Sequence, residues 1–252
     1  KIKKKLKTLS KVTEKLIKLE GDRGGWEAKE KFYKKGKLFE YGTNRLGNLI
    51  NKHKIFKELI LMPELLAAAH EVTKSDIKIA GFNLRNPLKG SGKQKIHMDW
   101  KPRKNKKEPY SGIVCFFFID KANVSNGSLR VVPGSHKKLG WPEKHIDVFK
   151  SHKKEIRMNV KAGTMVIANL NLWHGGSQNI SGKPRKMIMI NIKRRNLPQL
   201  INYKKYLNKN TKKSLNNSQK YLLAVRKNDK LQKANSVGVG KYYKGDFYLK
   251  KK

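Results

Sequence analysis

The chain has 252 residues, and its 60 Lys and Arg residues against 18 Asp and Glu residues give a formal net charge of +42. This length allows one domain with a sizeable core, and the single cysteine excludes an intramolecular disulfide framework and a Cys-based zinc cluster. No apolar run approaches the roughly 18 residues that a membrane helix needs, so we expect a single soluble, reduced domain with a cytoplasmic location.

The N-terminal part, residues 1–76, is predicted to be mostly helical. Residues 1–20 carry apolar side chains at helical spacing among lysines, which predicts a solvated basic helix. Residues 51–72 show the same spacing, and Pro63 within them predicts a kink or a division into two shorter helices. We expect this part to wrap around the rest of the domain.

From residue 77 the sequence changes to short β-rich runs separated by turn residues. The expected strands are 77–84, 96–100, 111–119, 128–132, 155–160, 164–168 and 186–193. Many short strands with Gly and Pro turns, and no alternation with helices, indicate an antiparallel sandwich or barrel over residues 77–195. Residues 196–252 are expected to form a basic C-terminal extension, with a helix near 216–226 and an aromatic-basic tail at 241–252.

The positive charge has three interpretations. Fifty of the basic residues are lysines spread from end to end, which is typical of an A/T-rich coding sequence, and this is the favoured interpretation. The same bias would also raise the glutamate content, and glutamate is scarce, so an attraction to anions remains to be explained. An anionic small substrate is the second interpretation, and nucleic acid or another polyanion is the least favoured but stays open.

Two short motifs bring metal-binding residue types into the β-rich region. His97 and Asp99 lie two residues apart on an expected strand, so their side chains point to the same side. His174 follows another expected strand and can bring a second imidazole to the same point. Two histidines and one carboxylate form the facial triad of non-haem Fe(II) oxygenases. An exposed pair or a structural hydrogen bond is the alternative for His97 and Asp99.

Arg185 lies eleven residues after His174, at the start of the next expected strand. From there a guanidinium can reach back over a metal pocket and bind a carboxylate through two hydrogen bonds. An α-keto acid co-substrate that chelates iron and carries a distal carboxylate needs such a partner. A surface charge after Pro184 is the alternative.

Five motifs occur along the β-rich region in a fixed order. They are His97-Met98-Asp99-Trp100, the eleven residues NGSLRVVPGSH from Asn126 to His136, Ala162-Gly163-Thr164, Trp173-His174-Gly175-Gly176-Ser177-Gln178-Asn179, and Arg185. In this order they resemble the phytanoyl-CoA dioxygenase family of Fe(II)- and 2-oxoglutarate-dependent oxygenases, and the resemblance covers roughly residues 77–195.

The resemblance implies a double-stranded β-helix, a cupin-like jelly roll that is mainly β with flanking helices. It implies that His97, Asp99 and His174 are the iron ligands and catalytic centre, and that Arg185 binds the distal carboxylate of 2-oxoglutarate. The family often has a small hydroxyl residue two positions after the second histidine, where it helps to hold this carboxylate. This chain has Gly176 there, and Ser177, which follows it, is the candidate for binding 2-oxoglutarate. Gln94 is a further candidate for contacting 2-oxoglutarate or the substrate.

Asp99 is retained, whereas halogenating relatives replace this carboxylate, so the resemblance implies hydroxylation or a related oxidation. The expected protein is a single oxygenase domain over residues 1–252 that uses Fe(II), 2-oxoglutarate and O2. The expected reaction hydroxylates a small, anionic or zwitterionic metabolite and releases succinate and CO2. The alternatives are an oxygenase acting on nucleic acid or on a protein-bound group, and a non-catalytic polyanion-binding jelly-roll protein.

Overall fold

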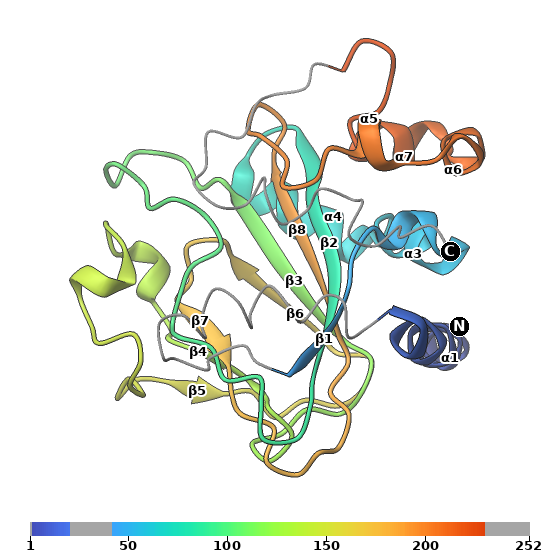
Figure 1. The fold of residues 1–252 in the computed structure, drawn as a ribbon. Coiled ribbons are helices and arrows are strands. Elements are labelled where there is room, and N and C mark those ends of the chain that lie inside the picture. The colour runs from blue at the N-terminus through green and yellow to red at the C-terminus, as the bar shows by residue number, and fades with distance from the viewer. Residues whose placement is uncertain (1, 21–41, 230–252) are drawn as a thin grey trace.

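The computed structural model describes residues 2–20 and 42–229, which Figure 1 shows as a coloured ribbon. The helices are α1 (Ile2–Glu20), α3 (Lys54–Leu59), α4 (Pro63–Thr73), α5 (Tyr203–Tyr206), α6 (Lys209–Ser214) and α7 (Asn217–Leu222). Short 3-10 helices lie at Leu49–Asn51, Ser135–Lys137 and Pro142–Lys144. The strands are β1 (Thr43–Leu46), β2 (Ile77–Pro87), β3 (Gly112–Phe118), β4 (Leu129–Val131), β5 (Ile156–Arg157), β6 (Met165–Asn169), β7 (His174–Gly176) and β8 (Met187–Arg194).

The strands form two sheets, and neighbouring strands in both sheets are antiparallel. The larger sheet has the order β1-β2-β8-β3-β6, and the smaller has the order β5-β4-β7. In Figure 1 the smaller sheet lies on one side of the larger sheet, and α1, α3 and α5–α7 lie on the other. The predicted antiparallel β core is therefore confirmed.

The central strands are buried on both faces, and their side chains alternate between two cores. Ile188, Ile190 and Ile192 of β8 point into the core beneath the helices. Met187 and Met189 of the same strand point into the core between the two sheets. This alternation directs every second residue of β8 toward the space in which the candidate site lies.

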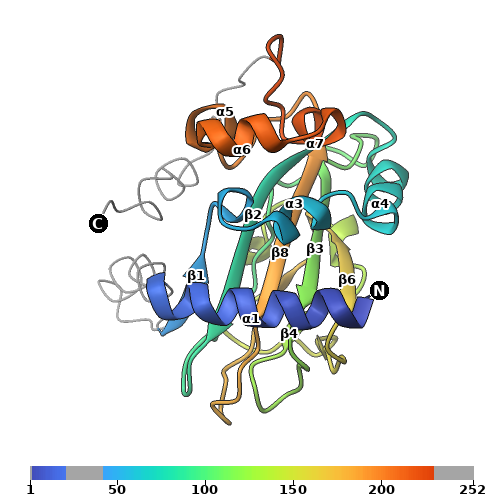
Figure 2. The same cartoon turned by 90° about the vertical axis from the view of Figure 1, so that its right-hand side faces the viewer.

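The helices cover the outer face of the larger sheet, and Figure 2 shows α1 lying across it. Leu9 of α1 is buried in the core beneath the helices, with Leu16 partly buried against it. The helix predicted to be solvated therefore packs its apolar face on the sheet. The second predicted helix is divided into α3 and α4, and Pro63 occupies the first turn of α4, where its missing N–H is not needed.

The structure differs from the predicted elements in three places. β1 lies inside the part predicted to be mostly helical and pairs with β2. The stretch 96–100 is not a regular strand and makes one isolated bridge, through His97. The short strand β7 was not expected as a separate element. The aromatic-basic tail at 241–252 lies outside the described residues. No helix among the described residues is long and apolar enough to cross a bilayer.

Candidate metal and co-substrate site

Three side chains from distant parts of the chain meet between the two sheets. His97, Asp99 and His174 each offer one ligand atom, and these atoms lie within 4.8 Å of one another. Asp99 Oδ1 is 3.8 Å from His97 Nε2 and 3.7 Å from His174 Nε2. The two imidazole centroids are 4.5 Å apart. Two imidazole nitrogens and one carboxylate oxygen with this spacing suit a divalent transition metal.

Backbone hydrogen bonds between separate segments bring the three residues together. His97 N–H donates to the His174 carbonyl, and His174 N–H donates to the His97 carbonyl, both at 2.9 Å. Asp99 N–H donates to the Leu170 carbonyl at 2.9 Å, just after β6. This reciprocal pairing replaces the regular strand expected at 96–100, and it still turns His97 and Asp99 to the same side.

The histidine rings are held with their Nε2 atoms toward the common point. His97 Nδ1–H donates to the Lys95 carbonyl, and His174 Nδ1–H donates to the Leu172 carbonyl, both at 2.9 Å. Because a carbonyl only accepts, each bond places the proton on Nδ1 and leaves the Nε2 lone pair for a metal. His174 Nε2 is buried and has no hydrogen-bond partner among the described residues. A metal ion would satisfy this atom, so the residues present fit one.

Asn191 of β8, in the larger sheet, supports the aspartate. Its side-chain N–H donates to Asp99 Oδ2 at 3.0 Å, which leaves Oδ1 directed toward the histidines. Asn191 was not identified from the sequence. The alternation of side chains along β8 could have identified it. Asn191 lies on the same face of the strand as Met187 and Met189, and the three isoleucines of β8 lie on the other face.

Arg185 lies two residues before β8 and is buried, with 3% of its surface exposed. Its Nη1 contacts the Met187 sulfur at 3.5 Å, and its Nε has no hydrogen-bond partner among the described residues. Burial lowers the pKa of the guanidinium to about 9; the nearby Arg85 lowers it further, and Asp120 opposes the shift. No carboxylate in the described part of the chain forms an ion pair with Arg185. It is therefore a buried cation suited to an anionic ligand.

Gln94 serves the architecture of the site. Its side-chain Oε1 accepts from Gly176 N–H at 3.0 Å, and its backbone N–H donates to the Gly176 carbonyl at 3.0 Å. A Cβ at Gly176 would lie 2.7 Å from the Gly92 carbonyl oxygen and 3.2 Å from Gln94 Oε1. Gly176, at the position where the family often has a hydroxyl residue, therefore faces Gln94. Ser177 Oγ is buried and without a hydrogen-bond partner among the described residues.

A buried ion pair not identified from the sequence joins β4 to the residue before β5, next to Gln94. Arg130 of β4 pairs with Glu155 at 3.1 Å, and both side chains are almost completely buried. Arg130 Nη2 also donates to the Gln94 carbonyl. Since Arg130 opposes Gly175 in the register of β4 with β7, the pair holds the chain next to His174.

The model of the phytanoyl-CoA dioxygenase family matches residues 8–187. Among curated proteins, the chain is 27% identical over 157 residues to the protein named dioxygenase olcK of Penicillium canescens. That match covers 59% of this chain and 50% of the relative, so the chain spans about half of the relative's length.

Solved structures show the same fold. HygX from Streptomyces hygroscopicus, with nickel, 2-oxoglutarate and hygromycin B bound, matches with a TM-score of 0.53 and 15% identity, over 62% of this chain and 72% of that one. The non-heme alpha ketoglutarate-dependent carbocyclase SnoK from nogalamycin biosynthesis matches with a TM-score of 0.53 and 15% identity, over 75% of both chains. These matches confirm the predicted jelly roll with flanking helices.

Proposed function

Because the chain belongs to the phytanoyl-CoA dioxygenase family, we propose that it is an Fe(II)- and 2-oxoglutarate-dependent dioxygenase. We further propose that it hydroxylates a small, anionic or zwitterionic metabolite. The observation that carries the proposal is the pairing of the His97, Asp99 and His174 cluster with a buried Arg185 that lacks a carboxylate partner among the described residues. The solved structure of HygX, with nickel and 2-oxoglutarate bound to the same fold, supports this choice of co-substrate.

The three ligand residues would hold Fe(II) on one side and leave the other coordination positions open. Bound there, Fe(II), 2-oxoglutarate and O2 supply an oxidation that yields succinate and CO2 and inserts one oxygen atom into a substrate C–H bond. Asp99 provides the carboxylate ligand, which favours hydroxylation. Asn191 keeps its second oxygen occupied, so that Oδ1 faces the metal position.

The other residues at the site bind the co-substrate and limit access of water. Arg185 would bind the distal carboxylate of 2-oxoglutarate through its guanidinium, in surroundings where a charge-assisted hydrogen bond is strong. Phe116 lies edge-on to His174, with 5.3 Å between ring centroids, and is buried in the core between the sheets. Apolar side chains of this kind shield the ligands from bulk water.

The test is an anaerobic titration of Fe(II) and then 2-oxoglutarate into the apo-protein, followed through the weak visible charge-transfer band of the chelate. Wild type should develop the band. His174→Ala should lose both metal binding and the band. Arg185→Met should bind Fe(II) as wild type does but need at least tenfold more 2-oxoglutarate. The matched control, Arg157→Met, replaces an arginine whose side chain is 46% exposed and should leave the titration unchanged.

Two results would contradict the proposal. If Arg185→Met binds 2-oxoglutarate as tightly as wild type, the carboxylate assignment is wrong. If wild type shows no band and instead binds a polyanion with a steep salt dependence, the non-catalytic polyanion-binding protein replaces the oxygenase.

A further inference from the structure

Two lysines face each other on the inner side of the larger sheet. Lys78 of β2 and Lys193 of β8 are direct partners in the antiparallel register. Their neighbours Ile79 and Ile192 point into the core beneath the helices. Because successive side chains alternate between faces, both lysines point the other way, toward the space that contains Asp99.

Lys193 is completely buried, yet it forms no ion pair with a carboxylate in the described part of the chain. Its Nζ lies 3.1 Å from the centroid of the Trp100 ring and 3.4 Å from the Pro198 carbonyl oxygen. Burial lowers the pKa of Lys193 to about 7; Asp99 opposes this shift, and Lys78 adds to it. An ammonium stabilised by one ring and one long hydrogen bond is a favourable partner for an anion.

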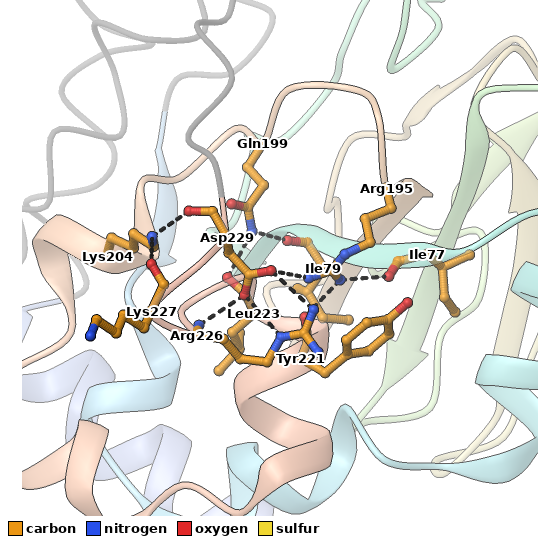
Figure 3. A network of polar contacts seen from close by, with 10 residues as sticks. All are labelled: Ile77, Ile79, Arg195, Gln199, Lys204, Tyr221, Leu223, Arg226, Lys227 and Asp229. Atoms are coloured by element: carbon orange, nitrogen blue, oxygen red, sulfur yellow. Dashed lines mark hydrogen bonds and ion pairs between the residues drawn. The ribbon is translucent and has the colours of Figure 1, made fainter.

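Lys78 is also buried, and burial together with Arg195 lowers its pKa to about 8 while Asp229 opposes the shift. Figure 3 shows the polar network that Arg195 forms with Ile77, the residue before Lys78 in the chain. Arg195 donates to Asp229 at 2.6 Å, to the Tyr221 carbonyl at 2.9 Å and to the Ile77 carbonyl at 3.4 Å. These bonds tie the start of β2, and with it the backbone of Lys78, to the C-terminal helices.

The lysine pair lies near the end of β8, and Arg185 lies two residues before its start. Asn191, which binds Asp99, lies between them, two residues before Lys193 and six after Arg185. In an extended strand, two residues span roughly 7 Å, so the lysine pair is the nearer of the two basic groups to Asn191. A co-substrate bound at Arg185 would leave the lysine end of the space for another ligand.

We propose that Lys193 and Lys78 bind a carboxylate or phosphate group of the substrate, on the far side of the candidate metal site from Arg185. This inference rests on the proposed function and assigns its substrate-binding residues. Trp100, which directly follows Asp99, is partly exposed and covers the Lys193 ammonium. When the anion binds, it replaces the Trp100 ring at the Lys193 Nζ. Substrate binding therefore displaces Trp100, the residue that follows the metal ligand Asp99 in the chain.

The test uses the 252-residue chain loaded anaerobically with Fe(II) and saturating 2-oxoglutarate, so that Arg185 is already occupied. Sulfate and propionate are titrated separately at constant ionic strength, and tryptophan fluorescence reports binding because Trp100 lies against Lys193. Lys193→Met and Lys78→Met should weaken binding of at least one anion tenfold or more. Lys193→Arg should retain part of the affinity. Lys153→Met, which removes an exposed lysine, should bind as wild type does.

Sulfate binding that depends on the lysines indicates a phosphate-bearing substrate, and propionate binding that depends on them indicates a carboxylate. If neither anion binds, or if Lys193→Met binds both as tightly as wild type while its thermal melting shows a folded protein, the inference is wrong. The visible chelate band, recorded in the same samples, separates the two proposals. Lysine-dependent anion binding without the band would overturn the proposed function and leave the anion site standing.

Discussion

The hydrogen bond from Asn191 to Asp99 gives a test of how the larger sheet positions the candidate metal ligand. We expect Asn191→Leu, which keeps the size of the side chain and removes its N–H, to weaken metal binding. Asp99 is only 14% exposed, so water replaces the lost donor poorly. A hydrogen bond to a charged group contributes about 1.5–3 kcal/mol. This corresponds to a roughly 10- to 100-fold loss of metal affinity, the range found for groups that orient metal ligands.

The assay is a competition titration of Ni(II) or Fe(II) against a chromophoric chelator. The control is Met189→Leu, which changes an apolar residue on the same face of β8, two residues from Asn191. It should bind metal as wild type does, since exchanging two apolar side chains of similar volume is well tolerated. If Asn191→Leu also binds metal with wild-type affinity, Asp99 does not depend on Asn191, and the reasoning from the 3.0 Å contact fails.

Two other predictions concern stability and reactivity. Arg130→Met should lower the free energy of unfolding in urea by about 3 kcal/mol, because it removes the buried partner of the Glu155 carboxylate. The remaining ion pair of Glu155 is with Arg157, at 3.4 Å, whose side chain is 46% exposed. Combining Arg130→Met with Glu155→Leu should restore a large part of that loss, and an equal or greater loss in the double variant would contradict the prediction. Cys115 of β3 should react with iodoacetamide only after unfolding, because burial raises the pKa of its thiol to about 12. Rapid labelling of the native protein, read by mass spectrometry, would refute this.

The sequence was most informative where local spacing fixes geometry. His97 and Asp99 are two residues apart, and that spacing turned their side chains to one side even though the expected strand is reduced to a single bridge. The division of the second helix followed from the missing N–H of Pro63. In both cases a rule about one or two neighbouring residues was sufficient.

The sequence was least informative where the partner lies far along the chain. Nothing local indicates that Arg130 pairs with Glu155, or that Lys78 opposes Lys193. Residues 1–76 were expected to wrap around the domain, but the burial of α1 against the sheet was not predicted, for a related reason. Its lysine content indicated a solvated helix, while the contacts of Leu9 decide its position.

The burial of three cations also changes how the large positive charge is interpreted. Composition alone favoured codon bias, which predicts lysines on the surface. Arg185, Lys78 and Lys193 are instead buried on the inner side of the larger sheet or at its edge, with lowered pKa values. Desolvating a cation costs several kcal/mol, and codon bias gives no reason for that cost. Anionic ligands at both ends of this space would offset it. The buried cations, rather than the total of +42, therefore carry the argument for an anionic substrate.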